Sequence, residues 1–220
     1  NLSDLDYHVL LQSVYTHLLR VNDPKVIIPT IGWFMATPLK PRFSEVYECF
    51  PILSIAGTRG AGKSTTLRLM WRLMGFKIGD DGKLFSCTET DFVMLKLLSS
   101  TTSIPILFDE YKPYDMPQQK VKSLRRTFRK AYDGEKEFRG RPDQSTVEYS
   151  LLAPIAVAGE VPLTEGALLE RIIAIEMSPN SLNQEMRDAY QALRALQLQA
   201  FMSRYIPFML GTDFELELAE

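Results

Sequence analysis

The sequence has little cysteine and little histidine. Its 220 residues include two cysteines, Cys49 and Cys87, and two histidines, His8 and His17. Neither pair has the close spacing of a zinc site, and two cysteines are too few for a disulfide framework. This composition argues against a disulfide-stapled secreted domain and favours a reducing compartment, so we expect a cytoplasmic protein.

Long hydrophobic runs and an excess of one charge are also missing. No stretch reaches the roughly 18 apolar residues that a membrane-spanning helix needs, and no signal peptide is visible, so we expect no membrane partner. The net charge is −2, so any nucleic-acid contact must come from a local basic patch. Because the chain begins without methionine, we expect it to be a piece of a longer protein.

Three stretches with different patterns divide the chain. Residues 1–49 show helical spacing of apolar residues over 3–21 and near 24–36, which predicts a helical N-terminal attachment. Pro38 and Pro41 are expected to break the second of these helices. Residues 50–178 alternate short apolar runs with helical segments, which predicts βαβ units and a mostly parallel sheet. Residues 179–220 are largely helical, with an interruption expected at Pro207, and are expected to form a lid or tail.

The expected core therefore has an α/β fold, with a central five-stranded sheet flanked by helices. Its expected strands are 52–56, 83–87, 104–109, 154–158 and 171–177. Its expected helices are 62–74, 90–98, 117–132 and 165–170.

A phosphate-binding motif follows the first expected strand. Residues 57–64 match G-x-x-x-x-G-K-[ST] at every fixed position, between a strand and a helix, as this motif requires. Glycines let backbone N–H groups approach phosphate oxygens, and the helix directs its positive end at them. Lys63 supplies a cation for the β- and γ-phosphates, and Ser64 supplies a hydroxyl for Mg²⁺. The expected ATP-binding residues are Gly57, Gly60, Ala61, Gly62, Lys63, Ser64 and Thr65.

Two carboxylates end the buried strand expected at 104–109. Ligands bind beyond the carboxyl ends of such strands, so Asp109 is expected to hold Mg²⁺ and Glu110 to activate the attacking water. This adjacent pair favours hydrolysis over phosphoryl transfer to a small molecule. A GTPase is disfavoured because no Asn-Lys-x-Asp motif occurs. The neighbouring strand ends in Gly159-Glu160 rather than in Asn, Thr or Ser, so Glu160 is the candidate sensor of the γ-phosphate.

Residues 118–141 form a basic patch in an otherwise acidic chain, with nine basic against three acidic residues. Most of these residues are explained by a helix face exposed to solvent. The alternative with a functional meaning is a surface that contacts nucleic acid or a neighbouring subunit. Residues 137–141 are expected to form an arginine-bearing loop. An arginine finger would come from this region or from Arg171 at the start of the last strand. The nucleic-acid or intersubunit candidates are Arg125, Arg129, Lys136, Arg139 and Arg141; candidate lid arginines are Arg187, Arg194 and Arg204.

This order of motifs resembles the AAA+ and related P-loop ATPases. More narrowly, Asp109-Glu110-Tyr111, Arg129 to Gly134, Arg139-Gly140-Arg141, Ala153 to Glu160 and Glu170-Arg171 resemble the ATPase modules of phage, plasmid and mobile-element primase–helicase proteins, which are similar to superfamily 3 helicases. The resemblance covers roughly residues 25–178. It implies a hexameric motor that moves on single-stranded DNA and is fused to a primase or polymerase. This chain has no primase signature of its own.

We therefore expect a helicase or translocase module that hydrolyses ATP with Mg²⁺ and acts on single-stranded DNA. A regulatory switch or scaffold ATPase, which assembles without moving nucleic acid, is the alternative. The sequence does not decide between DNA and RNA, or whether the N-terminal helices form a collar or simply pack on the core.

Overall fold

A parallel five-stranded sheet forms the centre of the computed structural model, which describes residues 2–76 and 84–211. The strands lie in the order β2-β3-β6-β1-β7, and every neighbouring pair is parallel, which confirms the expected α/β fold. Their bounds are β1 (Ile52–Gly57), β2 (Phe85–Ser86), β3 (Ile106–Tyr111), β6 (Ile155–Gly159) and β7 (Ile172–Met177). The strand expected at 83–87 is reduced to β2, and Lys83 lies outside the described residues.

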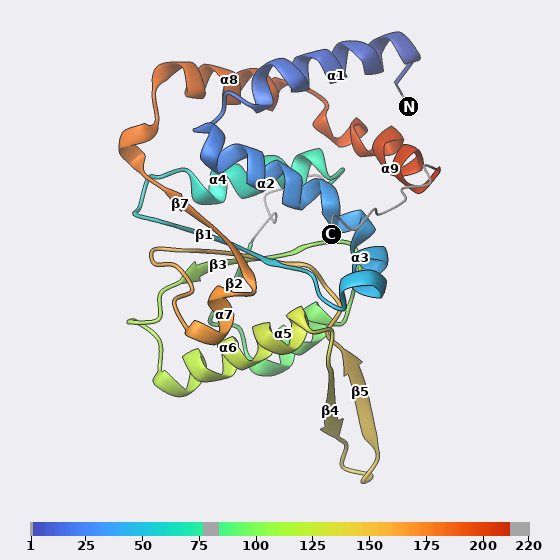
Figure 1. The fold of residues 1–220 in the computed structure, drawn as a ribbon, viewed down its shortest axis with the longest axis vertical. Coiled ribbons are helices and arrows are strands. Elements are labelled where there is room, and N and C mark those ends of the chain that lie inside the picture. The colour runs from blue at the N-terminus through green and yellow to red at the C-terminus, as the bar shows by residue number, and fades with distance from the viewer. Residues whose placement is uncertain (1, 77–83, 212–220) are drawn as a thin grey trace.

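Helices cover both faces of this sheet, as Figure 1 shows. One face packs against α4 (Lys63–Leu73) and α2 (Pro24–Ala36), and the other against α5 (Asp91–Leu98), α6 (Gln118–Tyr132) and α7 (Gly166–Leu169). Successive residues of one strand enter opposite cores: Leu107 belongs to the first, and Ile106 and Phe108 to the second. Strands buried on both faces read as continuous apolar runs, which explains why their positions were predictable.

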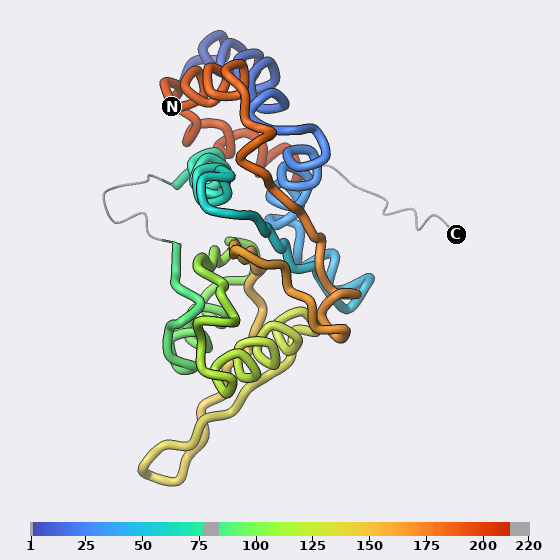
Figure 2. The backbone as a smooth tube through the Cα atoms, turned by 90° about the vertical axis from the view of Figure 1, so that its left-hand side faces the viewer, coloured from blue at the N-terminus to red at the C-terminus, as the bar shows by residue number. Residues whose placement is uncertain are grey.

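The N-terminal helix and the last two helices pack together at the pole of the molecule opposite its hairpin (Figures 1 and 2). There α1 (Asp4–Leu18) lies on α8 (Gln184–Ala195), and the Tyr7 hydroxyl donates a hydrogen bond to the Phe201 carbonyl at 3.0 Å. The helix α9 (Met202–Gly211) follows after a break near Gln197 and contains Pro207, so the interruption expected at Pro207 was wrongly placed.

Prolines divide the helical structure of the N-terminal part after α2, which ends at Ala36. Pro38 lies in the first turn of a 3₁₀ segment, Thr37–Leu39, and Pro41 in the first turn of α3 (Lys40–Tyr47). Proline fits this place because first-turn N–H groups have no partner within the helix, and its fixed φ is already helical. The helix expected near 24–36 ends at Ala36, as predicted, and the two prolines then lie in the first turns of two short helical segments that follow it.

A β-hairpin projects from the body between α6 and β6 (Figures 1 and 2). It consists of β4 (Lys136–Gly140) and β5 (Thr146–Ser150), paired antiparallel with Phe138 opposite Glu148. Residues 137–141 were expected to form a loop, and this is corrected, because 137–140 belong to β4. Their dense charge hid the strand pattern, since the alternation that marks a strand is carried mainly by the partner residues of β5. Among the described residues, no helix has the length and apolarity needed to cross a membrane.

Candidate functional site

The phosphate-binding motif forms a tight turn between the central strand β1 and the helix α4. Gly60 and Gly62 have φ values of 83° and 87°, in the left-handed region that favours glycine. At Gly57, a Cβ atom would lie 2.2 Å from the Met177 carbonyl oxygen, so only glycine allows β1 and β7 to approach this closely. The backbone of the turn is thereby free to direct its N–H groups outward, beyond the carboxyl ends of the strands.

The Lys63 ammonium lies over this turn. Its Nζ donates hydrogen bonds to the carbonyls of Gly57 at 2.6 Å and Thr58 at 3.0 Å. Burial lowers the pKa of Lys63, and the nearby carboxylates of Asp109 and Glu160 oppose that shift. The side chain is a cation held by carbonyl oxygens, which phosphate oxygens can replace as stronger partners.

Ser64 and Asp109 meet at the base of the turn. The Ser64 hydroxyl donates to Asp109 Oδ2 at 2.6 Å, which joins the start of α4 to the end of β3. A hydroxyl and a carboxylate are hard oxygen donors suited to Mg²⁺, which takes few protein ligands and completes its shell with water and phosphate. No cluster of three or more His, Cys, Asp or Glu side chains that could hold a metal occurs within residues 2–76 and 84–211. Ser64 and Asp109 together supply two such oxygen donors.

A β-bulge sets the position of Glu110. Phe108 pairs with Val157 and Tyr111 with Gly159, so β3 has one extra residue between these pairs. Glu110 has φ 63°, which is rare for a residue other than glycine, and its N–H bonds to Asp109 Oδ1 at 2.8 Å. Bulges re-aim side chains next to active sites, and strained backbone persists where the surroundings enforce it. Asp109 and Glu110 consequently line one cavity instead of pointing to opposite faces of the sheet.

An ion pair that the sequence did not reveal closes the same cavity. Lys112 Nζ lies 2.8 Å from Glu160 Oε1, which links the loop after β3 to the end of β6. A hydrogen bond from Lys112 lowers the pKa of Glu160, and the same contact raises the pKa of Lys112. Both side chains are about half exposed, at 41% and 49%, so their contact can exchange for a ligand. The signal available in the sequence was a lysine, Lys112, three positions after Asp109, together with a carboxylate, Glu160, where a neutral sensor side chain is usual.

These groups surround a cavity of about 500 Å³ at the carboxyl edge of the sheet. Its lining residues are Arg59, Gly60, Gly62, Lys63, Ser64, Thr65, Asp109, Glu110, Lys112, Gly159 and Glu160. The structure therefore brings five of the seven expected motif residues together with both carboxylates of β3 and with Glu160, whereas Gly57 and Ala61 are not among the lining residues. Arg59 and Lys112 add positive charge to a volume that already contains Lys63.

A smaller and more apolar cavity of about 270 Å³ lies on the other side of the turn and shares Gly60, Gly62 and Thr65 with the first. Its wall combines Val21 of the α1–α2 loop with Leu182, which precedes α8, and with Met186 and Tyr190 of α8. Asn22, 3% exposed, and Arg187 supply polar groups there. Segments from both ends of the chain build this cavity, which local sequence patterns did not indicate.

Arg171 does not reach the cavity of its own chain. It directly precedes β7, where Ile172 pairs with Ile52 at the strand end opposite Gly57 and Met177. Five residues at about 3.3 Å each separate the two ends by about 17 Å. Its guanidinium donates to the Ala167 carbonyl at 2.7 Å and lies 3.9 Å from Asp133 and 5.2 Å from the Tyr132 ring centre.

The other basic candidates also lie away from the cavity. Arg125 and Arg129 lie 3.9 Å and 2.8 Å from carboxylate oxygens of Glu165. Lys136 and Arg139 lie on the hairpin strand β4, and Arg141 begins its tip, where its N–H bonds to the Ser145 carbonyl at 2.7 Å. Of the lid candidates, Arg187 borders the smaller cavity, whereas Arg204 is paired with Asp4 at 2.7 Å.

Comparison with known proteins supports the fold. No protein-family model matches the chain, and none of the curated proteins does. A solved structure described as "SCCmec type IV Cch - active helicase" is similar, with a TM-score of 0.54 and 19% identity over 95% of this chain. This chain spans 38% of the length of that helicase chain. At this identity the likeness shows a shared fold.

Proposed function

We propose that this chain is the ATP-hydrolysing module of a motor that moves on single-stranded DNA. The observation that carries the proposal is the joint placement of the Lys63 turn, Ser64, Asp109 and Glu110 around one cavity. Phosphate, metal and water sites thus adjoin one another. A chain with the same fold is described as an active helicase, which supports the choice of a motor.

Each residue has a role in this account. Backbone N–H groups of the turn and Lys63 bind the phosphates, and Ser64 and Asp109 hold Mg²⁺, which neutralises phosphate charge when bound. Glu110 orients a water molecule and accepts its proton as the water oxygen attacks the γ-phosphorus. The bond from the γ-phosphorus to the β–γ bridging oxygen breaks, so ADP and phosphate are formed. Glu160 serves as the sensor of the γ-phosphate, together with its ion-pair partner Lys112.

The smaller cavity is proposed to receive the nucleobase and ribose. It adjoins the turn through Gly60 and Gly62, and its walls are apolar with a few polar groups, as is usual for small-molecule sites. The half-buried Tyr190 offers an aromatic surface for the base. Nucleotide would then contact the α1–α2 loop and α8 as well as the core.

The nucleic-acid and intersubunit roles rest on the basic residues. Lys136, Arg139 and Arg141 lie on a hairpin that projects from the body, where a strand threaded past the module would meet them (Figure 2). Arg171 lies far from its own cavity and is proposed to serve the cavity of a neighbouring copy, in a hexamer. Arg125 and Arg129 are alternative intersubunit arginines.

The proposed division of the chain is 1–49, 50–178 and 179–220, with α1 of the first part packed on α8 of the last. A primase or polymerase is proposed to be linked to this module in the longer protein.

A helicase assay tests this function. ATP should drive separation of a forked DNA duplex by the wild type and not by Glu110→Gln, and an ATP analogue that resists hydrolysis should not replace ATP. Hydrolysis without strand separation, in a sample shown to be assembled and indifferent to single-stranded DNA, would favour the regulatory switch or scaffold instead.

A further inference from the structure

Five of the six basic residues of α6 fall into two sets on different faces of the helix. Arg125 and Arg129 point to Glu165 in the loop before α7, and Arg125 Nε also donates to the Tyr111 hydroxyl at 3.3 Å. Their side chains are 27% and 35% exposed. This set is engaged in tying α6 to the core. The second set, Lys122, Arg126 and Lys130, is spaced by four residues and therefore forms one stripe on the other face.

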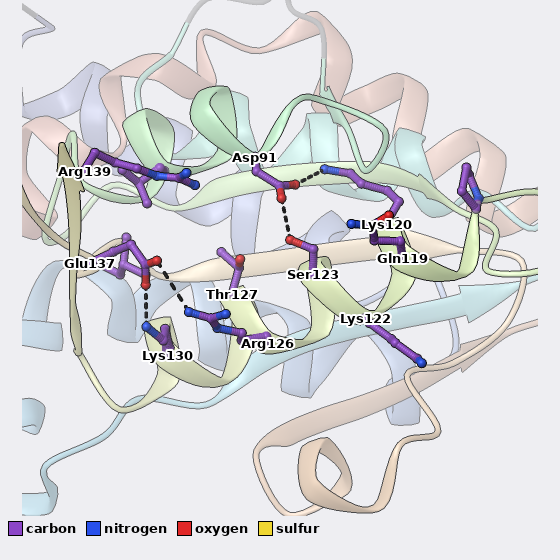
Figure 3. A pocket seen from close by; sticks show the side chains of 13 residues that line it. Asp91, Gln119, Lys120, Lys122, Ser123, Arg126, Thr127, Lys130, Glu137 and Arg139 are labelled. Carbon is purple, nitrogen blue, oxygen red and sulfur yellow. Dashed lines mark hydrogen bonds and ion pairs between the residues drawn. The ribbon is translucent and has the colours of Figure 1, made fainter. Parts of the chain in front are cut away.

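The second set borders a groove of about 690 Å³ between α5, α6 and the hairpin strand β4. Figure 3 shows Arg139 reaching from β4 towards Asp91, with Glu137 facing Lys130 and Arg126 from the same strand. The charged residues of the lining are Lys120, Lys122, Arg126, Lys130 and Arg139, with Asp91 and Glu137. Five cations against two carboxylates leave a net charge of +3, in a chain whose net charge is −2.

The two carboxylates hold the walls of this groove in place. Asp91 accepts from Lys120 at 2.8 Å and from the Ser123 hydroxyl at 2.6 Å, which fixes α5 to α6. Glu137 accepts a hydrogen bond from Lys130 and lies 3.6 Å from Arg126, which fixes β4 to α6. The hydrogen bonds from Lys120 and Lys130 lower the pKa of Asp91 and of Glu137, respectively, and the positive charge of Arg139 adds to both shifts. Within the described ranges, 2–76 and 84–211, the exposed side chain of Arg139 makes no direct hydrogen bond to either carboxylate. Arg126 is 63% exposed, so both guanidiniums are available to an anion.

An aromatic platform adjoins the same groove. Phe92 and Tyr149 meet edge to face with ring centres 6.3 Å apart, and Lys96 Nζ lies within 5.8 Å of both ring centres. Phe92 follows the groove residue Asp91 and is 52% exposed, and Tyr149 lies directly opposite the groove residue Glu137 in the hairpin. Positive grooves that follow the backbone beside aromatic side chains that stack on bases are typical of single-strand binding.

We propose that this groove binds the phosphate backbone of single-stranded nucleic acid, with Arg126 and Arg139 as phosphate ligands from opposite walls and Phe92 as a stacking surface for a base. The proposal rests on the proposed function and adds a binding site at the base of the hairpin, between α5, α6 and β4 and distinct from the hairpin tip. It also divides the basic residues of α6: Arg125 and Arg129 contact Glu165 on one face, and the face that carries Arg126 binds the strand.

The test is equilibrium binding of a fluorescent dT oligonucleotide of about 20 nucleotides, longer than one single-strand-binding domain usually covers. Arg126→Gln/Arg139→Gln removes two positive charges from the groove. Arg20→Gln/Arg68→Gln removes two from exposed positions on α4 and after α1, and serves as the matched control. The groove variant should bind about tenfold more weakly, and the slope of log K against log salt should fall in magnitude by about 1.4, or about 0.7 per phosphate contact.

Two further measurements complete the design. Phe92→Ala should weaken binding of dT about fivefold and leave binding of an abasic oligonucleotide unchanged, because only the first has bases to stack. Thermal unfolding midpoints show that each variant is folded. If the groove and control variants had equal affinity and salt slope, the groove would be rejected as the binding site and the proposed motor would stand. The strand contacts would then be assigned to Lys136 and Arg141. A wild type that hydrolyses ATP and binds no strand at low salt would reject both the groove and the motor.

Discussion

The hydroxyl of Ser64 lies 2.6 Å from Asp109 Oδ2, although 45 positions separate the two residues in the sequence. This contact joins the helix after β1 to the bulged end of β3, which is two strands away in the sheet. Parallel strands place their carboxyl ends at one edge, so residues that follow different strands converge there. The chemistry proposed for the cavity depends on this convergence.

Asp109→Asn should weaken the binding of Mg²⁺, so nucleotide binding should require a higher Mg²⁺ concentration. The amide keeps one oxygen that can accept the Ser64 hydrogen bond, and it loses the charge that holds a divalent cation. Titration of Mg²⁺ against binding of a fluorescent ATP analogue measures the effect, and the half-saturating concentration should rise roughly tenfold or more. Asp115→Asn, at an exposed position a few residues along, is the control and should titrate like the wild type.

Glu110→Gln should bind ATP and lose turnover. Glutamine retains the shape of the side chain and cannot accept the proton of the attacking water, so the hydrolysis rate should fall roughly 100-fold or more. Phosphate release in single-turnover conditions measures the rate, and equilibrium binding of the ATP analogue measures affinity. Wild-type turnover in this variant would remove Glu110 from the mechanism.

Lys112→Met and Glu160→Gln should have non-additive effects on the preference for ATP over ADP. The two side chains form one ion pair at the wall of the cavity, so each substitution already removes the partner of the other. Dissociation constants for ATP and ADP, measured in both single variants and the double variant, give the coupling. Additive effects would show that the pair does not act as a unit on the γ-phosphate.

The stability of the protein should rise with pH between about 8 and 10, through Lys40. Burial lowers the pKa of Lys40 to about 8, and its ammonium donates to the Leu152 carbonyl. Below pH 8 the folded state therefore carries the cost of a buried ammonium, and this cost disappears as pH rises towards the unfolded value of 10.5. The gain in free energy of unfolding is at most about 3 kcal/mol.

Urea unfolding at about pH 7.5 and about pH 9.5 measures this gain. Lys40→Met should flatten the rise, since it has no proton to lose, whereas Lys25→Met, at an exposed position, should keep it. An equal rise in Lys40→Met and in the wild type would assign the pH dependence to other groups.

The parts of the structure that could be predicted depend on local patterns. The turn at Gly57–Ser64 and the strand that delivers Asp109 and Glu110 have fixed spacings and continuous apolar runs, and the structure places them as expected. Glu160 reaches the cavity because β6 lies beside β3, an order that the βαβ pattern favours. What each of these residues binds stays a prediction.

The parts that could not be predicted depend on contacts between distant segments. The Lys112–Glu160 pair joins two loops, and the smaller cavity joins Asn22 to Tyr190 across most of the chain. In the sequence the basic residues of α6 form one patch. Only the packing of the helix shows that Arg125 faces Glu165 and that Arg126 faces the groove. The hairpin was missed because β4 is short and highly charged, so its pairing with β5 outweighs its own propensity.

The most direct test of the central claim is the steady-state ATPase rate of the wild type and Lys63→Ala, with and without single-stranded DNA, at rising salt. We predict hydrolysis by the wild type that single-stranded DNA accelerates, loss of both rates in Lys63→Ala, and a stimulation that fades as salt screens the phosphate contacts. A Lys63→Ala variant that hydrolyses ATP at the wild-type rate would contradict the proposed site. Hydrolysis by an assembled wild type that DNA leaves unchanged at low salt would contradict the motor.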